Sequence, residues 1–272
     1  MAAMATTEER AALAGSRLPR RVALVMPMAI AFVVFVTVWT LAIWIFTIPT
    51  YLLPSPWSLV VELVTHPLVY LRHAGVTLIE STFGFFIGAL IGAVIAVILN
   101  AAAFVERSLM PYLIALSNVP IVAFAPIVVI YFGFGMESKI VTAAFLTFFP
   151  VVVYTLRGLK SADVVHRDLF HVLASSRRDE FIHLRLPASL PYLFSALKVA
   201  ATASVLAATV AEFIQASQGL GWLILTSAYT NDMVRVWSTV IVCSTIAMVF
   251  YGVVALVERR MIPWHSSQSG RP

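Results

Sequence analysis

Long apolar segments alternate with short polar ones along most of this chain. A helix that crosses the hydrocarbon core of a membrane needs about 20 predominantly apolar residues. Six segments meet this requirement, so the pattern predicts an all-α polytopic membrane protein with six transmembrane helices. The predicted spans are residues 22–48, 76–99, 109–132, 140–156, 192–214 and 236–257. A further apolar segment, residues 219–230, is too short to cross and predicts a re-entrant or interfacial helix.

One long polar segment, residues 157–191, interrupts this pattern and carries ten charged side chains. Between residues 164 and 174 its apolar positions recur at nearly helical spacing, and Asp163 is placed to cap that helix. A second short helix is predicted over residues 179–186, ended by Pro187. The segment is therefore expected to be a structured loop outside the membrane.

Two roles fit such a loop. A short amphipathic helix can dock in a groove of a partner protein and transmit movement to it. Alternatively, the loop lies on the lipid surface, with three basic side chains near anionic headgroups. These are Arg177, Arg178 and Arg185.

The composition excludes a soluble protein. The chain is 61% hydrophobic and 11% charged, with a mean hydropathy of +0.95, whereas a soluble domain is roughly 45–50% apolar and about 25% charged. The single cysteine, Cys243, excludes an intrachain disulfide. The sequence contains no Gly-x-x-x-x-Gly-Lys-Ser/Thr phosphate loop, so ATP, if it is used, must be bound by another chain. The six histidines form no ligand cluster, and we predict no catalytic residue, metal site or cofactor in this chain.

The distribution of Lys and Arg predicts the orientation. With the N-terminus inside, 14 of these residues fall on the cytoplasmic side and 3 on the other side, and cytoplasmic loops of membrane proteins are enriched in them. Residues 1–21 and 258–272 are then cytoplasmic tails, and the 157–191 loop is cytoplasmic too. The net charge of +5 therefore reports orientation rather than nucleic-acid binding. The uncharged run at 22–48 is too long for a signal-peptide core of about 7–15 residues, which predicts a retained anchor.

The polar segment ends in Leu186-Pro187, with Leu184 before that pair and Ala174 and Asp168-Leu169-Phe170 upstream. This arrangement resembles the cytoplasmic motif of bacterial ABC importer permeases, which has a Glu-Ala-Ala triplet, a Gly, an Ile and a Leu-Pro pair in these positions. The acidic start and the Leu-Pro end match; the two Ala positions and the Gly do not. Five flanking segments are similar to the nitrate/sulfonate/taurine importer permeases, and the resemblance covers residues 51–264. These segments are residues 51–57, 132–135, 186–192, 211–213 and 219–224.

The resemblance implies a type I ABC importer permease in the bacterial inner membrane. Its partners would be two ATPase subunits, which bind ATP and Mg inside, and a solute-binding protein outside. The 157–191 loop would be the coupling loop, with Leu169 and Phe170 enlarging a site where the family has Ala. Members of the family carry nitrate, sulfonates and taurine, or pyrimidine precursors and riboflavin. Because the chain contains no internal repeat, a symmetric pore also requires a second copy, so we predict a homodimer.

Two spans carry candidates for the translocation path. At 100° per residue, Ser195, Lys198, Thr202, Thr209 and Glu212 fall on one stripe of the fifth span. Polar side chains at membrane depth usually face a cavity or a partner helix. The alternative is that Lys198 reaches the cytoplasmic interface and Glu212 lies near the outer one. In the third span, prolines interrupt the helix, and broken helices at membrane depth commonly line cavities. Its candidates are Ser117, Asn118 and Pro120, beside Pro111 and Pro126.

Gly84, Gly88 and Gly92 recur at four-residue spacing in the second span, which predicts close packing against another helix. The same span holds the carboxyl group of Glu80. Together with Glu212, Glu80 supports an alternative function, a secondary carrier that is driven by an ion gradient and has no ATPase.

Overall fold

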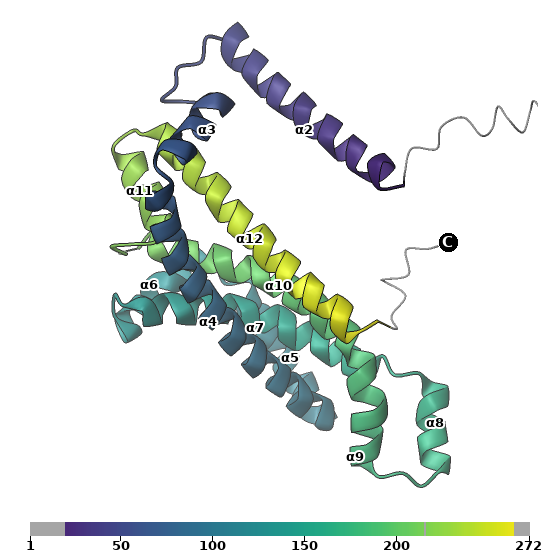
Figure 1. The fold of residues 1–272 in the computed structure, drawn as a ribbon. Helices are drawn as coiled ribbons and strands as arrows, with labels where there is room; N and C mark the ends of the chain where they lie inside the picture. The colour runs from purple at the N-terminus through teal and green to yellow at the C-terminus, as the bar shows by residue number, and fades with distance from the viewer. Residues whose placement is uncertain (1–19, 215, 264–272) are drawn as a thin grey trace, which may run out of the picture.

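The computed structural model describes residues 20–214 and 216–263, with side chains from residue 26 onward (Figure 1). Every regular element in this part of the chain is helical, as predicted. The N-terminal tail up to residue 19 and the C-terminal tail from residue 264 lie outside the described residues. The elements are α2 (Arg20–Ile45), α3 (Pro56–Thr65), α4 (Pro67–Ala101), α5 (Ala103–Ser117), α6 (Ile121–Phe132), α7 (Met136–Lys160), α8 (Val164–Val172), α9 (Arg177–Glu180), the π-helical turn η1 (Phe181–Arg185), α10 (Leu186–Glu212), α11 (Leu220–Tyr229) and α12 (Met233–Met261).

Five of these helices are long and apolar enough to cross a membrane, namely α2, α4, α7, the α9–α10 run and α12. The predicted third span, residues 109–132, is not one straight helix. It is divided into α5 and α6, which are bent by 99° to each other, so six spans are reached only if this pair counts as one. The cause is local: Pro120 is the N-cap of α6 and cannot donate a backbone hydrogen bond to continue α5.

Residues 179–186 are helical as expected, but the expected end of this helix at Pro187 is wrong. Helical backbone continues from Arg177 through η1 into α10 without a break, a run of 36 residues. Pro187 lies in the first turn of α10, where a missing N–H has no helical partner to lose. The polar loop between long helices is therefore shorter than predicted. We call residues 161–185, which include α8, α9 and η1, the polar arm.

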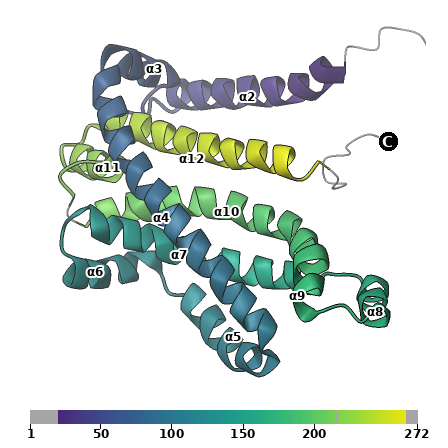
Figure 2. The same cartoon turned by 60° about the horizontal axis from the view of Figure 1, so that its bottom comes forward.

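Helix α7 is the centre of the fold, packed between α4 and α10 (Figures 1 and 2). The α4 contact depends on three glycines spaced one turn apart. They face Ala143, Ala144, Thr147 and Val151 of α7 so closely that a side chain on any of them would meet α7 atoms; these glycines are Gly84, Gly88 and Gly92. In contrast, α2 lies beyond α12, away from the α4–α7–α10 core (Figure 2); among its contacts is the tilted ring pair of Trp39 and Trp237.

Gly88 provides a direct test of this packing. A methyl group there would lie 2.8 Å from Thr147 Cβ and still closer to the Ala144 carbonyl oxygen, and a backbone oxygen cannot rotate away. We expect Gly88→Ala to destabilise the purified protein by about 1–3 kcal/mol, the usual cost of overpacking, and to lower its melting temperature in detergent. Gly75→Ala, in the same helix but with nothing within 4 Å of the added carbon, is the matched control. Equal melting temperatures for the two variants would contradict the packing described here.

Candidate functional site

The first candidate site is the polar arm. Asp163 caps α8 by accepting a hydrogen bond from the Val165 N–H at 3.2 Å. At the other end, the Ala174 N–H donates to the His171 carbonyl at 3.1 Å and the Ser175 N–H to the Phe170 carbonyl at 3.0 Å. This pair of bonds is the Schellman arrangement that closes many helices.

Ala174 explains one departure from the family motif. Its φ is +49°, in the left-handed region that glycine adopts more easily than any residue with a Cβ. The motif carries glycine at this position. Alanine therefore adopts, at some cost in strain, a conformation that a glycine at this motif position would adopt without it.

The side chains of α8 leave an apolar surface uncovered. Val165, Leu169 and Val172 are 72%, 52% and 83% exposed, and Asp168 beside them is exposed too, while Phe170 is half-buried. Figure 1 shows α8 at one extremity of the molecule, next to α9. The remaining motif positions lie elsewhere: Leu184 is in η1, and Leu186 and Pro187 begin α10. The motif thus divides between a projecting helix and the start of a long one.

One ion pair joins the two parts, and a second lies within the start of the long helix. Both Nε and Nη2 of Arg185 donate to Glu180 Oε1, at 2.9 and 2.7 Å. Arg167 of α8 reaches the same oxygen at 3.8 Å. The arm is therefore linked to the helix that runs on as α10.

The second candidate site is a polar cluster at the far end of α10, enclosed by α4, α10 and α11. The Glu212 side chain is fully buried. Its carboxyl group accepts hydrogen bonds from the Thr77 hydroxyl at 2.6 Å and from the Gly221 N–H at 2.5 Å. An acceptor at the start of a helix satisfies N–H groups that have no partner within the helix. Glu212 therefore fixes the N-terminus of α11.

Helix α4 supplies two further acceptors to the same turn. The Leu220 N–H donates to the Thr77 hydroxyl oxygen at 2.8 Å, and the Gly219 N–H donates to His73 Nδ1 at 3.0 Å. Gly219 has a φ of +111° and approaches the Glu212 carboxyl group closely, so a side chain there would be strained and obstructed. Sequence reasoning missed His73 and Thr77. Their spacing with Glu80, at i, i+4 and i+7, places all three on one face of α4 and was the available signal.

Two more charged groups adjoin this cluster. The carboxyl group of Glu80 lies beside that of Glu212, and its Oε2 has no hydrogen-bond partner among the described residues. The Lys139 ammonium, next to both, donates to the carbonyl oxygens of Phe134 and Gly135 at 2.5 and 2.8 Å. The cluster is enclosed within one copy of the chain.

The predicted stripe on the fifth span does not face one cavity. Thr209 is buried, with its hydroxyl 3.3 Å from Cys243 Sγ, and Glu212 is buried in the cluster, whereas Thr202 is exposed. Lys198 pairs with Glu258 of α12 at 2.7 Å. A lining role in this conformation is therefore open to Thr202 rather than to the whole stripe.

The candidates in the third span lie at its break. Ser117 and Asn118 end α5, and both donate to the Ile114 carbonyl oxygen at 2.7 Å. Their side chains and that of Pro120 are exposed. The structure brings these three together at the bend, where their role in the path stays a prediction.

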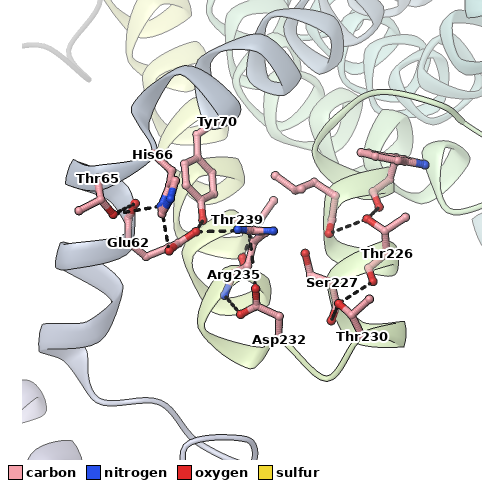
Figure 3. A network of polar contacts seen from close by, with 12 residues as sticks. Glu62, Thr65, His66, Tyr70, Thr226, Ser227, Thr230, Asp232, Arg235 and Thr239 are labelled. Carbon is pink, nitrogen blue, oxygen red and sulfur yellow. Dashed lines mark hydrogen bonds and ion pairs between the residues drawn. The ribbon is translucent and has the colours of Figure 1, made fainter.

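A third polar network was not predicted at all (Figure 3). Glu62 of α3 accepts hydrogen bonds from the Tyr70 hydroxyl of α4 at 3.1 Å and from Arg235 Nε of α12 at 3.3 Å. Its second oxygen lies 3.1 Å from His66 Nδ1, and Asp232 caps α12 through the Arg235 N–H. This network joins α3 to α4 and α12. Arg235 lies 173 positions from Glu62, too far for spacing to reveal the pair.

Comparison with known proteins agrees with this architecture. The family model described as "Binding-protein-dependent transport system inner membrane component" matches residues 84–263. The formylaminopyrimidine transport permease of Halalkalibacterium halodurans is 29% identical over 219 residues, which cover 80% of this chain and 88% of that protein. The taurine transport system permease of Escherichia coli is 26% identical over 239 residues, covering 85% and 87%.

Solved structures show the same fold. A chain of the MetNI methionine ABC transporter in an inward-facing conformation superposes with a TM-score of 0.63 at 15% identity, covering 71% of this chain and 95% of that one. An amino acid ABC transporter solved with histidines gives a TM-score of 0.60 at 15% identity, covering 74% and 98%.

These findings favour an ABC importer permease over an ion-gradient-driven carrier, because the family model is one of binding-protein-dependent transport and a relative is named as an ABC transporter permease. With its apolar helices, they make the chain a multi-pass inner-membrane protein. The chain belongs to the inner-membrane components of binding-protein-dependent transport systems, and within them to the nitrate/sulfonate/taurine permeases of ABC importers.

Proposed function

We propose that two copies of this chain form the translocation path of an ATP-driven importer, served by two ATPase subunits inside and a solute-binding protein outside. The observation that carries the coupling role is the uncovered apolar surface of α8, held out on a braced arm. The excess of Lys and Arg on the arm and at the chain ends supports a cytoplasmic position for them. ATP and Mg would be bound by the ATPases.

The polar arm and the buried cluster lie at opposite ends of one helical run, residues Arg177–Glu212, which we call the rod. It measures roughly 54 Å along its axis at 1.5 Å per residue and bends where α9 passes into α10 (Figures 1 and 2). Movement of α8 with a closing ATPase would be carried by the Arg167–Glu180–Arg185 contacts into this rod. Glu212 would pass it to α11 at the outer end. In this mechanism, the rod opens the path outward when ATP binds.

For the substrate, we propose an uncharged or weakly charged heterocycle rather than a small inorganic anion. Lys139 and Lys198, the lysines that α7 and α10 carry within the bundle, are already occupied by carbonyl oxygens and by Glu258. A small anion would need a free cation in their place. Among the relatives, one is named for formylaminopyrimidine and one for riboflavin.

The test is uptake into proteoliposomes that contain the permease, its ATPase and its binding protein. We expect ATP-dependent uptake of a labelled pyrimidine or flavin, competed at least about tenfold better by that class than by taurine or nitrate, a difference of about 1.4 kcal/mol. An uncoupler should leave uptake unchanged while ATP is present. Stronger competition by taurine or nitrate would refute the substrate class, and uptake that needs no ATP would refute the importer.

A further inference from the structure

A basic cavity lies between the end of α4 and the polar arm. Its volume is about 680 Å³, within the range of roughly 300–1,000 Å³ that small-molecule sites occupy. One part of its wall is apolar and comes from Val97, Ala101 and Phe181. The rest is mostly charged and comes from the arm. A ligand that fits this wall needs both an apolar and a charged part.

The charges of the wall do not balance. Four arginines face two carboxylates, Asp168 and Glu180. Glu180 is already engaged by Arg185 at 2.7 Å and by Arg167 at 3.8 Å. Arg177 and Arg178, the other two, form no ion pair with any described residue. An excess of two positive charges therefore faces the cavity.

Asn100 adds a second requirement. Its Oδ1 is buried and has no hydrogen-bond partner in the part of the chain that the structure describes, and a buried acceptor without a donor is costly. Asn100 lines the basic cavity and also a smaller one of about 280 Å³, which shares Arg167 and Arg185 with it. A ligand that turns this side chain toward the cavity and offers it a hydroxyl or another donor would supply the missing partner.

We propose that this cavity binds the headgroup of an acidic phospholipid of the phosphatidylglycerol type. The phosphate would lie between Arg177 and Arg178, because guanidinium groups bind phosphate through paired, charge-assisted hydrogen bonds. A headgroup hydroxyl would donate to Asn100 Oδ1. Basic pockets beside membrane helices on the cytoplasmic side commonly bind such headgroups.

The lipid is favoured over a free phosphate by what surrounds the cavity. The apolar wall at Val97 is continuous with other exposed apolar side chains of α4. Among them are Val94 and Ile98, which are 50% and 54% exposed. An acyl chain has a surface to follow from the cavity toward the bilayer. The proposal rests on the proposed function in one respect: the orientation of the chain, which places the cavity beside the cytoplasmic leaflet.

A lipid bound here would join the end of α4 to the polar arm. The arm contacts the bundle through few elements, chiefly where η1 meets α10 and α7. A bridging headgroup would therefore fix the position from which α8 meets its partner. The acidic lipid would then be a structural component of the polar arm.

Native mass spectrometry of the full-length permease, titrated with single lipids in detergent, tests this without any ATPase, so a failure to couple would not disturb the result. We expect phosphatidylglycerol to bind at least about tenfold more tightly than phosphatidylethanolamine. Arg177→Gln with Arg178→Gln should weaken phosphatidylglycerol binding by about tenfold or more. Asn100→Asp, which adds a negative charge without changing size, should do the same and serves if the double variant does not fold.

The matched control is Arg259→Gln with Arg260→Gln, an adjacent and exposed pair at the end of α12 outside the cavity. Its binding should equal that of the unmodified chain. Equal loss in both double variants would mean non-specific attraction and would overturn the proposal. So would equal binding of the two lipids, or binding of inorganic phosphate by a protein that does not bind phosphatidylglycerol.

Discussion

Glu212→Leu is expected to release α11 from the bundle. The change removes the acceptor for the Thr77 hydroxyl and the Gly221 N–H and leaves Lys139 with one carboxyl neighbour fewer. Deleting one member of a buried charged cluster costs about 3–5 kcal/mol. We expect a marked drop in melting temperature in detergent and faster hydrogen exchange at the backbone amides of Gly219–Gly221, beyond that of the rest of the chain.

Three comparisons separate this role from a general effect of lost charge. Glu212→Gln keeps an acceptor oxygen and should cost less, about 1–3 kcal/mol. Glu137→Gln, at an exposed position in the first turn of α7, should be nearly neutral. Thr77→Val combined with Glu212→Gln should be non-additive by about 0.5–3 kcal/mol, since the two groups share a hydrogen bond. Additive losses would show that Glu212 acts independently of α4.

Replacing Asp168-Leu169-Phe170 with three glycines should abolish coupling while leaving the membrane helices in place. Each glycine costs a helix about 1 kcal/mol relative to alanine, and α8 has only nine residues. Loss of α8 removes the apolar surface that an ATPase would contact. In the assembled transporter, substrate-stimulated ATP hydrolysis should fall by at least about tenfold, or 1.4 kcal/mol.

The control for this change is a glycine triplet at Arg259-Arg260-Met261, three exposed residues that end α12. It should leave stimulated hydrolysis close to that of the unmodified transporter. Both variants should reach the membrane in equal amounts, which an immunoblot of membrane fractions measures. Undiminished hydrolysis in an assembled complex that carries the α8 triplet would remove α8 from the coupling mechanism.

The predicted fold class and family are confirmed, and both depend on local signals. Hydropathy identifies apolar helices because each residue contributes independently of its distant neighbours. The α8 cap was visible for the same reason, since Asp163 and the N–H that it accepts from are two residues apart. The sequence shows prolines that interrupt the third span, but its pattern predicts one crossing over residues 109–132 and not two helices bent by 99°. Whether a proline kinks or divides a helix depends on the packing of both halves, which spacing does not contain.

The buried cluster shows the limit of local reasoning. Glu212 was selected as a polar residue at membrane depth, but its partner Thr77 lies 135 positions away. Likewise, Arg235 and Glu62 are 173 positions apart. One chain gives no signal for such pairs until the helices are placed. The same reasoning leaves Glu212 either on a polar wall or near the outer interface, because helical spacing defines a face but not what covers that face.

The π-helical turn at Phe181–Arg185 has a consequence for how the length of this chain can vary. Hydrogen bonds in a π-helix join residues five apart rather than four. A π-helical turn therefore holds one residue more than an α-helical turn. Removing that residue would rotate α9 and the attached α8 by about 100° around the axis of α10. The direction in which α8 points is thus encoded by chain length as well as by side chains. A one-residue deletion in this turn would therefore aim α8 away from its partner.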